Sequence, residues 1–342
     1  MLASAWRGET PERAIFVRAP ISRCIFRMRL LLQIARSRRL HISGSIAVGC
    51  AVGGLTVHHF VSAGWPLRNP NVPLVLLAAG LFLAAYATKA LGWRRLFRRD
   101  VRPGALALAA AGGAASVTGV ALPGRFDDVV RIAVVRRFPG PRAGFGAICL
   151  SLFLLGLLDS AALTPLASVA AAVTDTSTVV RAGLIAVAAA GVGATGVVLA
   201  LPYLSRLRWI SHLRLCGWLR EHSACPREAS KAWVYIAVSW GLRAVALVVL
   251  LEALSLGGSF RLALAFLVGS SASAALPIAP AGAATQAGAG AVMLVTAGVK
   301  TSEAAAFALA AQTLGILIGA LVLLGAAAWH IGQRWRTPAV AL

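Results

Sequence analysis

Long apolar runs alternate with short basic segments along most of the chain. The longest runs approach or exceed the roughly 20 residues that a helix needs to cross a bilayer. They lack the amphipathic periodicity of helices that cover a water-soluble core. They predict six membrane-crossing helices, at residues 44–63, 73–92, 143–165 with an extension toward Ala172, 181–202, 232–254 and 303–329. The expected fold class is therefore an all-α polytopic integral membrane protein.

Two further apolar stretches are rich in small residues and contain prolines. Residues 104–122 end before Pro123, and residues 262–298 contain Pro280 and Gly282. Irregular backbone at membrane depth is tolerated where protein or water surrounds it. We expect both stretches to be broken or re-entrant and to enter the membrane from opposite sides. Such paired segments suggest an inverted repeat with a substrate site, as in transporters, although small residues also allow simple close packing of helices.

The charge of the chain sets the expected orientation. Its 342 residues include 33 Lys and Arg against 11 Asp and Glu, a net charge of +22, while 59% of the residues are hydrophobic. Most basic residues flank the apolar runs, so membrane topology and anionic lipid explain them better than a nucleic-acid partner does. If residues 104–122 crossed the membrane, the arginines that follow would lie outside. A hairpin that returns to the cytoplasmic side avoids this conflict.

These patterns divide the chain into three parts. Residues 1–43 form a basic cytoplasmic tail, and residues 330–342 form a short cytoplasmic tail. Between them, residues 44–329 form one transmembrane domain with halves at 44–172 and 181–329. The positive-inside rule places both termini in the cytoplasm.

Acids and arginines meet directly after the first broken segment. Asp127 and Asp128 stand between Arg125 and Arg131. Acids beside the hydrocarbon region are costly and are usually functional, and guanidinium groups bind phosphate oxygens in a two-pronged way. Asp128 and Arg131 also have the spacing of an intrahelical pair, and Asp127 is a candidate helix N-cap. We expect this segment to recognise an anionic head group at the cytoplasmic face.

Two charged residues, Asp159 and Arg243, lie near the middle of predicted crossings. An isolated charge there is expensive, so we expect mutual pairing or a polar cavity. The chain shows no nucleophile–base pair, and its five cysteines include no CxxC motif. No catalytic residue, metal site or cofactor is therefore expected.

Several of these motifs occur together in a known family. The segment around Asp127 resembles the Pro-Gly-x-x-Gly-Glu-x-x-Arg motif of the lysylphosphatidylglycerol synthase transmembrane-region family, also called the flippase-like domain. Three positions match: Pro123, Gly124 and Arg131. Asp127 and Asp128 stand where that family has Gly and Glu.

The resemblance continues along residues 45–328 in order and spacing. Asp159 matches the Asp of the family's Glu-Arg-x-x-Asp motif, but Leu155 and Gly156 replace the Glu and Arg. The sequence Trp240-Gly-Leu-Arg243 resembles a Trp-x-x-Arg helix of the family, and the stretch through Pro280 and Gly282 resembles its Pro-x-x-Pro-Gly-Gly turn. The acid expected soon after that turn is replaced by Gln286 and Ala287. These departures identify a divergent member.

The resemblance implies a flippase-like protein that binds a phosphate-bearing lipid or lipid-linked intermediate and translocates it between leaflets. The sequence leaves open a non-transporting membrane subunit that anchors or regulates a lipid or cell-envelope enzyme, and, ranked third, a membrane-embedded lipid-modifying enzyme. Lysyl transfer in the family belongs to a separate soluble domain, and we do not expect it in this chain. Expected partners are an anionic membrane lipid and other membrane proteins, and the expected location is a bacterial cell membrane. The candidate binding residues are Arg125, Asp127, Asp128, Arg131, Asp159, Arg243, Pro280 and Gly282.

Overall fold

A computed structural model describes residues 58, 62, 64–67, 70–120, 126–138, 143–173, 178–204, 226–274 and 282–336. Within these ranges every regular element is a helix, which confirms the all-α fold class. Residues Ser45–Leu342 form one compact unit. The predicted basic tail at 1–43 lies outside the described residues. So does the predicted helix at 44–63, apart from His58 and Ser62.

Five helices in the described part of the chain are long and apolar enough to cross a membrane. They are α2 (Val72–Arg95), α5 (Phe145–Val173), α6 (Thr178–Leu204), α8 (Pro226–Ala253) and α11 (Thr301–Arg336). They confirm five of the six predicted crossings, and most of these helices extend beyond the predicted ranges. Helix α5 continues past Pro165, because neighbouring helices can satisfy the backbone group that a proline frees in a transmembrane helix.

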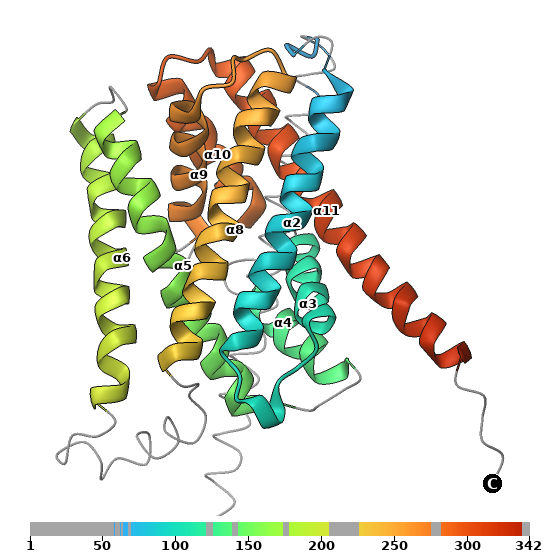
Figure 1. The fold of residues 1–342 in the computed structure, drawn as a ribbon. Coiled ribbons are helices and arrows are strands. Elements are labelled where there is room, and N and C mark those ends of the chain that lie inside the picture. Colours follow the sequence, from blue (N-terminus) through green and yellow to red (C-terminus); the bar gives the residue numbers. More distant parts are fainter. Residues whose placement is uncertain are drawn as a thin grey trace, which may run out of the picture. The chain divides into compact units, whose positions relative to one another are not determined.

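The two predicted broken segments are pairs of short helices. The first pair is α3 (Ala105–Thr118) and α4 (Phe126–Arg137), and the second is α9 (Phe260–Ala274) and α10 (Gly282–Thr296). Helix α3 has 14 residues, so it is about 21 Å long and shorter than the ~30 Å hydrocarbon core. In Figure 1 the pair α3–α4 starts and ends at the lower end of the bundle, and α9–α10 starts and ends at the upper end. This arrangement supports the predicted opposite entry.

The contacts between helices follow the order of an inverted repeat. Helix α2, the pair α3–α4 and α5 correspond in chain order to α8, the pair α9–α10 and α11. Each half repeats the same contacts: α2 packs on α3 as α8 packs on α9, and α4 packs on α5 as α10 packs on α11. Across the halves, α3 packs on α11 and α9 packs on α5. The inverted repeat that the two broken segments suggested therefore has a structural counterpart.

Helices α2 and α8 form the central pair of this arrangement. They lie so close together at Gly92 that a Cβ there would come within 3.0 Å of Ile236. The buried Ser239 hydroxyl of α8 donates a hydrogen bond of 2.8 Å to the carbonyl of Ala85 on α2. Small residues allow this close approach, and the interhelical hydrogen bond adds to it. Together these contacts set the relative height of the polar side chains that the two helices carry.

Candidate functional site

A carboxylate joins three helices in the interior of the bundle. Lys89 on α2 forms an ion pair of 2.8 Å with Oδ2 of Asp159 on α5. The indole nitrogen of Trp240 on α8 donates a hydrogen bond of 2.9 Å to Oδ1 of the same carboxylate. The Lys89 and Asp159 side chains are each 22% exposed. Both oxygens of Asp159 therefore have a donor, and its negative charge is compensated by Lys89.

Arg243 lies beside this cluster but is not an ion-pair partner in it. Its guanidinium carbon is 5.2 Å from the centre of the Trp240 ring and 5.7 Å from the centre of the Tyr86 ring. Its Nε is buried and has no hydrogen-bond partner among the described residues. Aromatic faces attract a cation, but they do not accept its directional hydrogen bonds in the plane of the guanidinium. Arg243 is thus a half-buried cation with unused donor capacity.

The predicted pairing of Asp159 with Arg243 is wrong. Asp159 pairs with Lys89 instead, and no ion pair of Arg243 with a described residue occurs. Lys89 lies within the predicted crossing at 73–92, near its end, and was not among the predicted binding residues. One signal could have identified it: Tyr86 and Lys89 are three residues apart, as are Trp240 and Arg243. Residues with this spacing share one face of a helix, and the two pairs meet where α2 packs on α8.

A second cluster lies in the first turn of α4. Arg131 contacts Oδ2 of Asp127 at 3.0 Å and Oδ1 of Asp128 at 2.8 Å, so the predicted intrahelical pair is confirmed. The helix begins at Phe126, which places Asp127 inside its first turn rather than at the cap. Carboxylates are still favoured there by the helix dipole. Two carboxylates share one guanidinium, and the three side chains are 26–34% exposed.

The two clusters belong to one electrostatic neighbourhood. Arg131 and Arg243 are both close enough to Lys89 to interact with it electrostatically. Three cations and three acids therefore gather between helices α2, α4, α5 and α8. Their pairing is uneven, because Arg131 has two acids and Lys89 has one, while Arg243 has no acid among the described residues.

The two helical hairpins, α3–α4 and α9–α10, meet beside these charged side chains. The backbone nitrogen of Ala283, in the first turn of α10, donates a hydrogen bond of 3.3 Å to the carbonyl of Gly119 at the end of α3. One turn earlier on α3, Ser116 forms a hydrogen bond with the Tyr86 hydroxyl. Arg243 stacks on the ring of the same tyrosine. Tyr86 therefore links Arg243 to Ser116, close to the place where α3 and α10 meet.

The candidate residues are thus only partly brought together. Asp127, Asp128 and Arg131 form one cluster, and Asp159 and Arg243 both contact Trp240 in the other. Gly282 begins α10 at the hairpin junction. The remaining two candidates, Arg125 and Pro280, lie outside the described residues.

Comparison with known proteins gives one family. The family described as "Lysylphosphatidylglycerol synthase TM region" matches residues 42–325, which is most of the chain. Comparisons with curated proteins and with solved structures give no match.

Proposed function

Because the chain belongs to the lysylphosphatidylglycerol synthase transmembrane-region family, we propose that it binds a phosphate-bearing lipid or lipid-linked intermediate and translocates it between leaflets. The family and the apolar helices make it a multi-pass membrane protein of a lipid-related family. We place it in a bacterial cell membrane with both termini in the cytoplasm. The basic segments that flank its helices support this orientation.

The guanidinium of Arg243 carries the proposal, because it has no acid partner among the described residues and its Nε has no acceptor there. A cation in a membrane-spanning segment is costly unless it is paired or faces a polar cavity. Trp240 and Tyr86 supply part of the compensation by cation–π contact, while the buried Nε has no acceptor among the described residues. Phosphate oxygens match the planar donor geometry of a guanidinium. A lipid phosphate would therefore supply both the missing charge and the missing acceptor.

The hairpin junction supports translocation rather than binding alone. Two short helices that enter from opposite ends and meet inside the bundle create a broken pathway at membrane depth, as in transporters built from inverted repeats. The amino terminus of α10 at Gly282 lies at this junction, and helix amino termini favour anionic groups. The path we propose runs from the Asp127–Arg131 cluster past Arg243 to the junction.

The main test replaces Arg243. In proteoliposomes that contain fluorescent phosphatidylglycerol, phosphatidylethanolamine or phosphatidylcholine, we expect Arg243→Gln to slow translocation of the preferred lipid about tenfold or more, because hydrogen bonds to charged groups contribute roughly 1.5–3 kcal/mol. Arg243→Lys keeps the charge but loses the planar fork, so it should recover only part of the rate. Arg181→Gln, at an exposed position on α6, serves as the control. A variant Arg243→Gln that translocates at the wild-type rate contradicts the proposal.

The α4 cluster gives a second test. We expect Asp128→Asn and Arg131→Gln to reduce translocation roughly threefold to tenfold with folded yield retained, because an intrahelical pair at a helix surface contributes only about 0.5 kcal/mol to stability. Arg98→Gln, in the basic segment after α2, should leave the translocation rate nearly unchanged. The measurements are the rate in proteoliposomes and the monodisperse yield in detergent. If all three changes slow translocation equally, the cluster is only part of a diffuse basic surface.

The replaced motif residues favour a second candidate, a non-transporting membrane subunit. Leu155 stands where the family resemblance expects a glutamate, and it is buried and 3% exposed. Ala287 stands near the expected acid after the second turn and is also buried. These apolar positions cannot relay protons or hold a cation. If the protein binds lipid in the same panel but translocates none of the lipids, this second function replaces the first. We rank a lipid-modifying enzyme third.

A further inference from the structure

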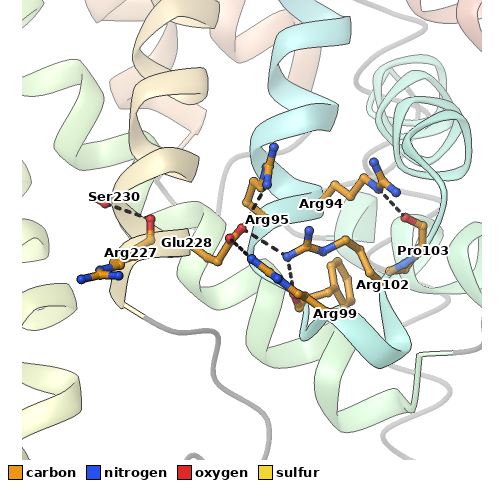
Figure 2. A network of polar contacts seen from close by, with 9 residues as sticks. Arg94, Arg95, Arg99, Arg102, Pro103, Arg227, Glu228 and Ser230 are labelled. Atoms are coloured by element: carbon orange, nitrogen blue, oxygen red, sulfur yellow. Dashed lines mark hydrogen bonds and ion pairs between the residues drawn. The ribbon is translucent and has the colours of Figure 1, made fainter.

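A separate group of arginines surrounds one carboxylate where α2 and α8 meet at one end of the bundle (Figure 2). Glu228, in the first turn of α8, accepts hydrogen bonds through Oε2 from Arg95 at 3.3 Å and from Arg102 at 3.2 Å. Its other oxygen, Oε1, accepts one from Arg99 at 3.5 Å. Arg99 begins the short 3₁₀ helix η1 (Arg99–Val101), and Arg102 directly follows it. Glu228 itself is buried.

One carboxylate cannot compensate three guanidinium groups. Arg102 donates to Glu228 and to the carbonyl of Phe97, but its Nε is buried without a partner among the described residues. Arg99 is 83% exposed and touches Glu228 only at the outer limit of a hydrogen bond. The surrounding chain adds four basic residues and one acid, namely Arg94, Arg98, Arg227, Lys231 and Asp100. The group therefore has a strong excess of positive charge and unused donors.

The cluster lies at the edge of the apolar zone. Arg95 is the last residue of the apolar helix α2, and Glu228 is the second residue of the candidate span Arg227–Ala253. Lipid phosphates occupy the interfacial layer just outside the hydrocarbon core. The neighbouring backbone is held in place, because Arg94 donates a hydrogen bond of 3.3 Å to the carbonyl of Pro103. Glu228 thus gathers the arginines at the depth where a phosphate group is available.

We propose that Arg95, Arg99 and Arg102 form a second anion site that takes a phosphate group at this interface. The group is either the phosphate of an anionic lipid or free phosphate, since both present the same oxygens to a guanidinium. Arg99 turns from its weak contact with Glu228 to the phosphate, while Glu228 keeps Arg95 and Arg102 in position. The site is distinct from Arg243 and does not depend on translocation.

The test measures binding by the purified full chain in detergent. A fluorescent short-chain phosphatidylglycerol reports binding by anisotropy, with short-chain phosphatidylcholine and inorganic phosphate as competitors. We expect Arg99→Gln to weaken phosphatidylglycerol binding about threefold to tenfold, the range of one partly exposed charge-assisted hydrogen bond. Arg98→Gln is the matched control because it removes the same charge from the neighbouring residue, whose side chain pairs with Asp100. It should change the affinity less than about twofold.

Further arms separate the possible outcomes. If inorganic phosphate displaces the fluorescent lipid, free phosphate is a sufficient ligand. If unlabelled phosphatidylglycerol displaces it but inorganic phosphate does not, the site requires the lipid head group. The loss in Arg99→Gln should persist when Arg243 is also replaced by Gln, which separates the two sites. Because the Arg99 side chain is exposed, the Arg99→Gln variant should fold normally. Its affinity for phosphatidylglycerol therefore tests the proposed site directly. Equal losses in Arg98→Gln and Arg99→Gln, or no loss in either, overturn the proposal and leave the network a structural contact between α2 and α8.

Discussion

Replacing Asp159 with Asn is expected to destabilise the bundle by about 2–3 kcal/mol. Removing one partner of a buried ion pair typically costs about 3–5 kcal/mol, and we lower this figure because each side chain keeps 22% of its exposure. Asn can still accept the hydrogen bond from Trp240, so the loss comes mainly from stranding the Lys89 ammonium. The midpoint of SDS-induced unfolding in mixed micelles measures the change.

A double-mutant cycle identifies the partner of Asp159. Lys89→Met together with Asp159→Asn should cost less than the sum of the single changes, with a coupling energy of about 1–3 kcal/mol. The cycle of Asp159→Asn with Arg243→Gln is the matched control and should show a much smaller coupling. A larger coupling for Arg243 than for Lys89 would contradict the ion pair of Lys89 with Asp159 and favour the pairing predicted from sequence.

Gly113→Ala is expected to displace the first hairpin from α11. A Cβ at Gly113 would collide with the backbone carbonyl oxygen of Gly319 and would lie 3.3 Å from the nitrogen of Leu323. Backbone atoms cannot turn aside as a flexible side chain can, so the helices must separate. Overpacking of this kind costs about 1–3 kcal/mol, and the displacement should also reduce translocation. Thermal stability in detergent and the proteoliposome rate measure the two effects.

The neighbouring glycine supplies the control for this change. A Cβ at Gly112 would meet only the Tyr86 ring, at 3.9 Å, which is an ordinary contact. Alanine is favoured over glycine inside a helix by roughly 1 kcal/mol, and this gain applies to both positions. Gly112→Ala should therefore be neutral or slightly stabilising. If both variants lose stability to the same extent, the close approach of α3 to α11 does not explain the effect.

The helices of the membrane domain were largely predictable because the bilayer restricts what the chain can do. Backbone groups in hydrocarbon must be satisfied within a helix, so apolar runs such as 73–92 and 232–254 translate directly into α2 and α8. The pair of short helices α3 and α4 was predictable from the small residues of 104–122, the Pro-Gly sequence after them and the arginines that follow. The ends of helices were less predictable, since α11 continues to Arg336, beyond the apolar run that identified it.

The site was predictable only where its geometry is local. Asp128 and Arg131 lie three residues apart, so any helix through them brings their side chains together. Asp159, Arg243 and Lys89 lie on three different helices, and no spacing along the chain determines which two meet. The packing of α2 on α8, through Gly92 and Ser239, brings Lys89 to Asp159 and turns Arg243 toward Tyr86.

The sequence by itself determined that this chain crosses a membrane several times, that two of its segments are broken, and that charges remain inside. These properties depend on the free energy of single segments in hydrocarbon, which composition sets. Only the tertiary structure decided which charges are paired, where the two hairpins meet, and that Glu228 gathers three arginines. Ion pairs and hydrogen bonds require contact within about 3–4 Å, and such contact between distant residues depends on how the helices pack.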